Sequence, residues 1–316
     1  MRALLVVNPK ATTTSERSRD VLIRALRSAA DLRVEFTRRR GHAVTLVRDA
    51  ALHGVDVVVT LGGDGTVNEA VNGLMGALGE LPMMADTAPA DRLPALAVVP
   101  GGSTNVFARA IGLPKDWVEG TGVILEGMRA GRFRTIGLGR ADDRYFTFCA
   151  GFGLDAAVIR RVERARSRGR VSTAPLYLRS TASEYLATDR RHPAISLERP
   201  AETAIDELAT VIIQNTTPWT YLGDRAVSPN PDASFDLGLD VLAIRQLAVA
   251  SATRTVTQIL SPRSNPHGRQ VVQLHDIHEF TLLARRPEAF QLDGDYLGER
   301  EKVRFTSVAQ ALRVIC

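Results

Sequence analysis

The sequence predicts an α/β domain with a parallel sheet, followed by a second domain of mostly antiparallel strands arranged as a β-sandwich or barrel. In residues 1–130, hydrophobic strand-like segments alternate with segments of helical periodicity, which indicates βαβ units around a parallel sheet. After Gly131, short runs rich in β-branched and aromatic residues are separated by turn residues, a pattern typical of antiparallel sheets. This change of pattern places the domain boundary near Ala130–Gly131, and 316 residues suit two domains.

The expected elements of the first domain follow from the spacing of its apolar residues. Strands are expected at residues 3–8, 33–37, 56–61 and 95–99. Helices are expected at residues 15–30, 42–53 and 66–78, and a further helix begins at residue 105. Ser15 is a suitable N-cap for the first helix, because its hydroxyl can accept a hydrogen bond from the first turn. The prolines of residues 81–93 predict a loop.

The second domain is expected to consist of short strands with two helical insertions. The strands are expected at residues 133–138, 145–149, 194–197, 208–213, 239–244, 271–274 and 279–284. The helical insertions are expected at residues 154–187 and 246–260.

Composition and charge narrow the class of protein. The formal net charge of +5 suggests an anionic partner such as a nucleotide, a phospholipid surface or a nucleic acid. Two cysteines, Cys149 and Cys316, cannot form a disulfide framework, which fits a reducing compartment. Because no apolar stretch approaches the roughly 20 residues that span a bilayer, we expect a cytoplasmic protein.

The strongest local signal is the run from Leu61 to Glu69, which reads Leu-Gly-Gly-Asp-Gly-Thr-Val-Asn-Glu and joins a buried strand to a helix. Its three glycines permit positive φ and let backbone N–H groups approach an anion closely. The unpaired N–H groups at the start of the helix also favour a phosphate. The run matches neither the dinucleotide-binding Gly-x-Gly-x-x-Gly nor the P-loop. It therefore predicts a phosphate-binding loop of another class.

Three further polar turns follow predicted parallel strands. They are Asn8-Pro9-Lys10, Thr37 with Gly41-His42, and the run 100–105, which reads Pro-Gly-Gly-Ser-Thr-Asn. Each turn taken alone is commoner as a plain turn than as a binding site. Because open α/β sheets bind ligands at the carboxyl ends of their strands, four polar turns at one edge predict a nucleotide site there.

These motifs resemble those of the diacylglycerol kinase catalytic family, which includes bacterial diacylglycerol kinases and sphingosine and ceramide kinases. The matching segments are residues 8–9, 37–43, 62–69, 100–109, 151–156 and 293–295, in the usual order and spacing. The resemblance implies an ATP-binding α/β domain like that of NAD and diacylglycerol kinases, a β-sandwich lipid domain and an active site between them. It also implies that residues 305–316 return to the first domain, so the expected domains are 1–130 with 305–316, and 131–304.

The resemblance assigns an ATP-binding role to the residues of the four turns. They are Asn8, Pro9, Lys10, Thr37, Gly62, Gly63, Asp64, Gly65, Thr66, Val67, Asn68, Glu69, Gly102, Ser103, Thr104 and Asn105. Glu69 is expected to help hold the loop. Mg²⁺ would accompany the ATP, with Asp64 as the protein carboxylate near it.

The resemblance also implies a catalytic base in the segment Asp293-Gly294-Asp295, where either aspartate would take the proton from the lipid hydroxyl. From the residues alone, Asp-Gly favours a hairpin turn over a catalytic role. The family usually has Glu at the position of Asp295, and Asp can do the same chemistry.

Two other positions depart from the family pattern. Val106 stands where an Asp is frequent, so one carboxylate of the cation network is absent. Leu237 replaces one Asp of a structural magnesium site, which leaves Asp236 as the better remaining ligand there.

A lipid acceptor requires the protein to reach a membrane surface. Six arginines crowd one segment, namely Arg160, Arg161, Arg164, Arg166, Arg168 and Arg170. Such a cluster attracts anionic phospholipid headgroups, although a solvated helix face explains it about equally well. Few aromatic residues accompany it, so nucleic acid is not an expected partner. We therefore predict a peripheral protein of the inner membrane face that acts on a lipid, and a homodimer is compatible with the family resemblance.

The predicted function is transfer of the γ-phosphate of ATP to a lipid hydroxyl, with diacylglycerol as the first acceptor. Alternatives are an NAD kinase, a sugar kinase, and a nucleotide- or lipid-binding protein that has lost catalysis. NAD kinases share the Gly-Gly-Asp-Gly-Thr turn, but their Asn-Glu pair lies well downstream of it. Here Asn68-Glu69 follows the turn directly, which favours the lipid kinase.

Overall fold

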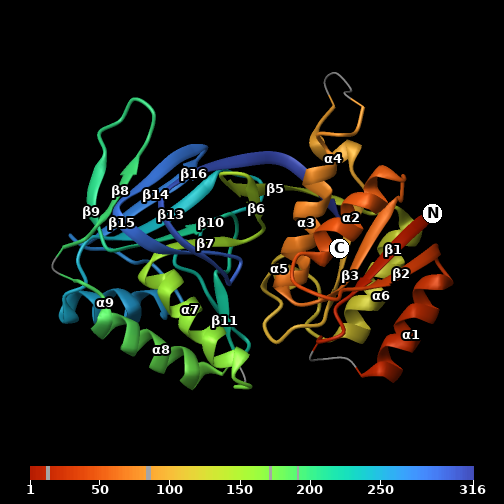
Figure 1. Cartoon of the computed structure of the whole chain (residues 1–316), viewed down its shortest axis with the longest axis horizontal. Helices are drawn as coiled ribbons and strands as arrows, with labels where there is room; N and C mark the ends of the chain where they lie inside the picture. Colours follow the sequence, from red (N-terminus) through yellow and green to blue (C-terminus); the bar gives the residue numbers. More distant parts are fainter. Residues whose placement is uncertain (12–14, 83–86, 171–172, 191) are drawn as a thin grey trace. The chain divides into compact units, whose positions relative to one another are not determined.

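The chain forms two compact units in the computed structural model, which describes residues 1–11, 15–82, 87–170, 173–190 and 192–316 (Figure 1). Unit 1 comprises Met1–Leu138 and Ala309–Cys316, and unit 2 comprises Gly139–Val308. These limits lie eight and four residues beyond those expected from the sequence. The shift arises because residues up to Leu138 and from Ala309 onward make their contacts within unit 1.

Unit 1 contains a parallel sheet with the strand order β4-β3-β1-β2, and the last residues of β16 run parallel to β4 at Val314 and Leu96. Its strands are β1 (Arg2–Val7), β2 (Asp31–Phe36), β3 (Val57–Gly62) and β4 (Ala95–Pro100). The central strands β3 and β4 are buried along their whole length, as expected for a parallel sheet covered on both faces.

Helices cover both faces of this sheet: α2 packs on α3, and α1 contacts α6 (Figure 1). The helices of unit 1 are α1 (Glu16–Arg27), α2 (His42–Leu52), α3 (Asp64–Ala77), α4 (Pro89–Arg92), α5 (Val106–Ala110) and α6 (Trp117–Ala130). The predicted N-cap is confirmed, since the Ser15 side chain accepts a hydrogen bond from the Ser18 N–H. The predicted loop at 81–93 contains α4, and residues 83–86 within it lie outside the described residues.

Helix α6 was missed from the sequence although its ends carry clear signals. The Asp116 carboxylate accepts hydrogen bonds from the N–H groups of Val118 and Glu119, and Gly131 ends the helix in the left-handed conformation. An acidic N-cap and a C-terminal glycine, here on either side of a 14-residue helix, are the usual limits of a helix.

Unit 2 contains an antiparallel sheet with the strand order β14-β13-β10-β7-β15-β16. Its strands are β5 (Arg134–Ala141, which begins in unit 1), β6 (Arg144–Phe146), β7 (Cys149–Gly153), β8 (Ile195–Glu198), β9 (Ile205–Leu208), β10 (Thr210–Gln214), β11 (Thr220–Leu222), β12 (Arg225–Val227), β13 (Leu239–Ile244), β14 (Val271–Ile277), β15 (Glu279–Leu292) and β16 (Asp295–Val314). The prediction of a parallel α/β region followed by a mostly antiparallel region is therefore confirmed.

The two faces of this antiparallel sheet have different neighbours. Val211 and Ile213 of β10 point into the main core, where Phe305 stacks on Phe280 with ring centroids 5.0 Å apart. Ile212, between them, points to the opposite face and packs with Ile259 of a helix. The alternation follows from the two-residue period of a strand.

The helices of unit 2 are α7 (Leu154–Ser167), α8 (Ala174–Ala187) and α9 (Val249–Ile259), and all three lie along one side of the unit (Figure 1). The single helical insertion expected at 154–187 is thus two helices, because Gly169 adopts a positive φ of 84° just after the first. None of the described helices is both long and apolar enough to span a membrane.

Candidate functional site

The four polar turns of unit 1 lie together at the carboxyl edge of the parallel sheet, where hydrogen bonds join them. The Asn8 amide, at the end of β1, donates to the Thr66 hydroxyl in the Gly-rich run at 3.2 Å, and its carbonyl oxygen accepts from the Lys10 N–H. The Gly101 N–H donates to the Gly62 carbonyl at 2.8 Å. The sequence prediction that these turns share one edge is therefore confirmed.

Glycines allow the turns after β3 and β4 to touch through their backbones. A Cβ on Gly102 would lie 2.6 Å from the Gly63 Cα, and a Cβ on Gly101 would lie 2.8 Å from the Gly62 nitrogen. Real Cβ atoms do not approach so closely, so these two glycines are required by packing, independently of any ligand.

Asp64 links the same two turns by its side chain. Its carboxylate oxygens accept hydrogen bonds from the N–H groups of Val106 at 3.1 Å and Phe107 at 3.0 Å, at the start of α5. The Asn105 side chain closes the second turn on itself, accepting from the Gly102 N–H and donating to the Gly102 carbonyl, each at 2.8 Å. Asp64 thus has a structural contact in addition to its predicted place near the cation.

Glu69 holds the turn after β2. Its two carboxylate oxygens accept from the Gly41 N–H at 2.7 Å and the Ala43 N–H at 3.1 Å, at the start of α2. This geometry gives the expected loop-holding contact a definite form, a carboxylate at a helix N-terminus, which the helix dipole favours.

The start of α3 lies at this edge of the sheet and is where the sequence predicts an anion. Its N-cap is Gly63, which has no side chain to cap the helix, so the first-turn N–H groups lack that partner. Val67 and Asn68 are each only 1% exposed, and their ATP contacts stay predictions. Lys10 and Ser103 are exposed, and Thr37, Gly65 and Thr104 are partly exposed.

In unit 2, Asp293 and Asp295 have different environments. Asp293 and Gly294 have positive φ values of 49° and 79° and form the two-residue hairpin turn between β15 and β16. The Asp293 carboxylate is buried and accepts four hydrogen bonds of 2.8–3.2 Å, from the N–H groups of residues 147–149 and the Thr147 hydroxyl. Asp295 is partly exposed. The geometry gives Asp293 a structural role and leaves Asp295 as the better candidate base.

A buried amide connects the turn to α7, a link that the sequence did not reveal. Gln291 accepts a hydrogen bond from the Gly294 N–H at 2.9 Å and donates one to the Asp155 carboxylate at 3.0 Å. Burial raises the pKa of Asp155 to about 6, and the hydrogen bond from Gln291 opposes this shift. Asp155 retains some exposed surface as a residue, but its carboxylate packs on Gly151, where a Cβ would clash with it. The motif at residues 151–156, which contains Asp155, was the sequence signal that could have pointed to this contact.

The predicted metal and headgroup residues have the following surroundings, and their roles stay predictions. No group of three or more His, Cys, Asp or Glu side chains that could hold a metal ion occurs within the described part of the chain. Asp236 is exposed, and its role as a metal ligand stays a prediction. Two of the six arginines are engaged within unit 2: Arg160 pairs with Glu299 at 3.0 Å, and Arg161 pairs with Glu184 at 2.7 Å. The headgroup role of the six arginines stays a prediction.

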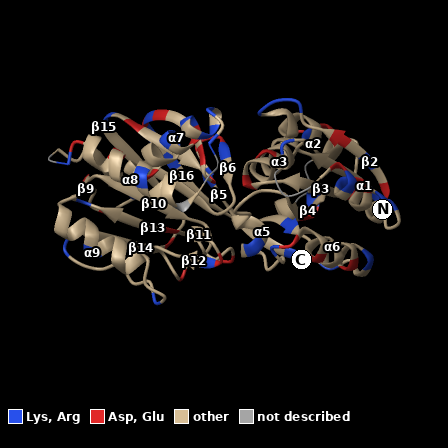
Figure 2. Ribbon diagram, turned by 90° about the horizontal axis from the view of Figure 1, so that it is seen from below, with Lys and Arg blue, Asp and Glu red and all other residues tan. Residues whose placement is uncertain are grey.

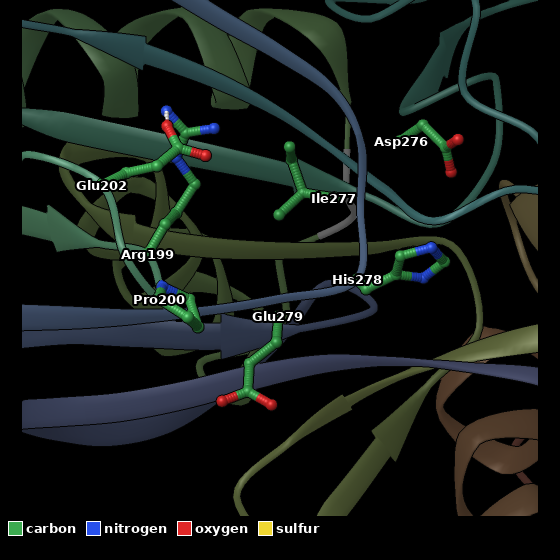
Figure 3. A pocket seen from close by; sticks show the side chains of 7 residues that line it. All are labelled: Arg199, Pro200, Glu202, Asp276, Ile277, His278 and Glu279. Carbon is green, nitrogen blue, oxygen red and sulfur yellow. Dashed lines mark ion pairs between the residues drawn. The ribbon is translucent and has the colours of Figure 1, made fainter.

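An open pocket of about 250 Å³ in unit 2 contains none of the predicted site residues (Figure 3). It is lined by Arg199, Pro200, Glu202, Asp276, Ile277, His278 and Glu279. Arg199 pairs with Glu202, while Asp276, His278 and Glu279 point in different directions (Figure 3). The lining does not converge on a point where a ligand atom could bind.

Comparison with known proteins agrees with this arrangement. Residues 2–141 match the model of the diacylglycerol kinase catalytic domain. The family resemblance predicted from the motifs is therefore confirmed for this N-terminal part of the chain.

Relatives and solved structures extend the comparison. The diacylglycerol kinase of Bacillus subtilis is 32% identical over 155 residues, which are 48% of this chain and 46% of that protein. The chain thus matches about half the length of this curated relative. A diacylglycerol kinase structure from Bacillus anthracis has a TM-score of 0.70 at 19% identity and covers 99% of this chain and 96% of its own. An NAD kinase from Archaeoglobus fulgidus, solved with ATP, has a TM-score of 0.51 at 9% identity and covers 100% and 94%. These two likenesses show the fold.

Proposed function

We propose that this protein is an ATP-dependent lipid kinase that transfers the γ-phosphate to a lipid hydroxyl, with diacylglycerol as the acceptor. The observation that carries the proposal is the carboxyl edge of the parallel sheet in unit 1. There four hydrogen-bonded turns surround the uncapped start of α3, within residues that match the diacylglycerol kinase catalytic domain. The ATP in the structurally similar NAD kinase supports ATP as the nucleotide.

The residues of unit 1 fit a nucleotide triphosphate. The first-turn N–H groups of α3 would donate to phosphate oxygens, and the helix dipole would favour their charge. Lys10, Thr37, Ser103 and Thr104 retain exposed surface at the same edge. Asp64 and Glu69 keep the turns in place through backbone hydrogen bonds, so the edge is preorganised before the nucleotide binds.

The described residues do not form a protein cage for Mg²⁺. This fits an ion that arrives with the nucleotide, because Mg²⁺ is usually held by phosphates, water and one or two carboxylates. Asp64 is the carboxylate that the Gly-rich turn would offer, directly or through water. When bound, the ion neutralises phosphate charge.

Asp295 would act as the base that takes the proton from the acceptor hydroxyl. Asp293 cannot share this task without losing the hydrogen bonds that hold residues 147–149 to the turn. Gln291 would orient the turn by accepting from the Gly294 N–H.

The test is ADP release from ATP and Mg²⁺ with diacylglycerol in mixed micelles, compared across wild type, Asp295→Asn and Asp295→Glu. Loss of the base should lower kcat about 100-fold or more, because general base catalysis contributes roughly 10²–10⁴-fold. Asp295→Glu should retain activity, since Glu supplies the same carboxylate. Melting temperatures would show that both variants fold.

Parallel assays with sphingosine, ceramide, a sugar and NAD would separate the alternatives. Turnover with NAD as the only acceptor would contradict the proposed lipid kinase activity. ATP binding without turnover on any acceptor would indicate a protein that has lost catalysis.

A further inference from the structure

Helix α8 buries two polar side chains and exposes two leucines, whereas an ordinary surface helix buries its leucines. Its buried residues are Ser180 and Glu184, one helical turn apart, which are 2% and 8% exposed. Glu184 contacts α7, where Arg161 donates to its carboxylate at 2.7 Å and Arg160 lies 3.7 Å away. Tyr185 of α8 also packs against the apolar cluster of Ala209, Ile244 and Leu247. The side of α8 that packs on the protein is therefore held by an ion pair, hydrogen bonds and this aromatic contact.

The opposite side of α8 carries an exposed apolar stripe. Pro175, Leu178, Ala182 and Leu186 are all exposed and are spaced three, seven and eleven residues from the first, which places them on one helix face. Leu178 and Leu186 are each 73% exposed. In water a surface helix normally turns such a stripe toward the core.

Helix α9 shows a second exposed stripe on the same side of unit 2. Val249, Val256 and Leu260 are 64%, 49% and 37% exposed, at helical spacing. The other side of α9 packs on the sheet through Ile259. Figure 1 shows α7, α8 and α9 along one side of unit 2, and Figure 2 looks onto α8 and α9 from below.

The segments that carry or precede these stripes are rich in arginine. Residues 164–183 contain five arginines and no Asp or Glu, and residues 245–275 contain four arginines and no Asp or Glu. Arg164, Arg166 and Arg168 are exposed at the end of α7. Arg170 and Arg179 line one open surface pocket of about 360 Å³ together with Pro175, so guanidinium and apolar groups share a surface.

We propose that this side of unit 2 binds the surface of a bilayer that contains anionic phospholipid. We call it the helical docking face. It comprises the stripe of α8, the exposed residues Val249, Val256 and Leu260, and the arginines 164, 166, 168, 170 and 179. The leucines would enter the boundary between headgroups and acyl chains while the arginines contact phosphate groups, as interfacial helices do.

Charge complementarity selects this occupant. A second copy of the chain on the same face would bring the arginine-rich segments of both copies together, and like charges oppose such an interface. A free soluble anion would use the arginines but leave the leucines in water. An anionic bilayer matches both the charge and the apolar stripes.

The inference deepens the proposed function by naming the surface at which the lipid acceptor is met. It is tested by vesicle sedimentation without nucleotide, using phosphatidylcholine vesicles with and without phosphatidylglycerol. Wild type should bind only the anionic vesicles, and binding should fall as salt rises. Leu178→Ser with Leu186→Ser should weaken binding about tenfold or more through lost apolar burial. Arg166→Ala with Arg168→Ala should do the same through lost charge, at about fivefold per arginine.

Matched controls come from exposed residues of unit 1. Val21 and Val118 are 52% and 57% exposed, and Val21→Ser with Val118→Ser should leave vesicle binding unchanged. Arg17→Ala with Arg27→Ala is the corresponding control for charge. Melting temperatures of all variants would exclude unfolding as the cause of weaker binding.

Three results would overturn the inference: wild type ignores anionic vesicles, the leucine variant binds as well as its control, or wild type is a dimer that the leucine variant dissociates. The last result would identify a second copy as the occupant. Vesicle binding without turnover would refute only the proposed kinase activity. Turnover in micelles without vesicle binding would refute only the docking face.

Discussion

The Gly-rich edge of unit 1 and the Asp-Gly turn of unit 2 use carboxylates in similar ways but at different depths. In unit 1, Asp64 and Glu69 are partly exposed, and each accepts two backbone N–H groups from a neighbouring turn. In unit 2, Asp293 is 4% exposed and accepts four hydrogen bonds from residues about 145 positions away. The first arrangement joins neighbouring turns at one edge of a sheet, whereas the second holds two distant segments together.

The same contrast in burial occurs within one short motif of unit 2, between Asp293 and Asp295. Asp293 and Asp295 are two residues apart, yet one is buried in a hydrogen-bonding network and the other keeps exposed surface. A buried carboxylate that already accepts four hydrogen bonds must give up some of them to contact a substrate hydroxyl, and each loss leaves a buried donor without its acceptor. The comparison therefore predicts that the two aspartates respond differently to the same substitution.

The largest expected effect is the loss of stability in Asp293→Asn. The amide would place N–H groups against N–H donors of residues 147–149, leaving buried donors without an acceptor. We expect about 3 kcal/mol or more of destabilisation, measured by urea unfolding. The matched variant Asp295→Asn should change stability by less than about 1 kcal/mol while abolishing turnover. Equal stability of the two variants would show that Asp293 is no more important to the fold than Asp295.

A smaller effect of opposite sign is expected for Asp155→Asn. The pKa of Asp155 is raised from its ordinary 3.8 to about 6, so the folded state binds this proton more tightly than the unfolded state does. Stability should therefore fall as pH rises from about 4 to about 6, by up to about 3 kcal/mol, and remain lower above that range.

The Asn side chain carries no charge and can still accept from Gln291, so the variant should be more stable than wild type at pH 8. Urea unfolding at several pH values measures this contribution as the difference between the two proteins. Lower stability of Asp155→Asn at pH 8 would show that the charged carboxylate is favourable in the fold.

The smallest of these effects concerns the contact between the turns of unit 1. Gly102→Ala would place a Cβ 2.6 Å from the Gly63 backbone, so the turns must move apart. We expect about 1–3 kcal/mol of destabilisation, which is typical of overpacking, together with weaker ATP binding by calorimetry.

Gly122→Ala is the matched control, since a Cβ there meets nothing within 4 Å and the residue lies inside α6. It should stabilise the helix slightly and leave ATP binding unchanged. If Gly102→Ala binds ATP like the control, close packing of these turns does not organise the nucleotide site.

Much of unit 1 was predictable because its signals are local. The four parallel strands, which begin at Arg2, Asp31, Val57 and Ala95, start and end within two residues of their expected limits. The four polar turns meet at one edge as predicted. The turns meet because parallel strands connected by helices all have their carboxyl ends at the same edge of the sheet, whatever their side chains are. Helix α6, which was not predicted, also has local signals, since Asp116 and Gly131 mark its two ends in the sequence.

Unit 2 was less predictable because its contacts are long-range. Strand β15 was expected to end at residue 284 but continues to Leu292, since its second half pairs with β7. The arginine cluster was treated as one patch, but Glu184 and Glu299, both distant in sequence, engage Arg160 and Arg161. Periodicity could not reveal either partner.

The sequence by itself predicted the parallel α/β plan, the meeting of four polar turns at one edge and the resemblance of the N-terminal part to the diacylglycerol kinase catalytic domain, because glycine-rich turns and apolar periodicity act over a few residues. Only the tertiary structure decided which of Asp293 and Asp295 is buried, the hydrogen bonds from Asp155 through Gln291 to Gly294, and the exposure of the α8 leucines. Those features depend on which distant segments meet. Burial and hydrogen-bond partners, unlike local periodicity, arise only when the chain has folded.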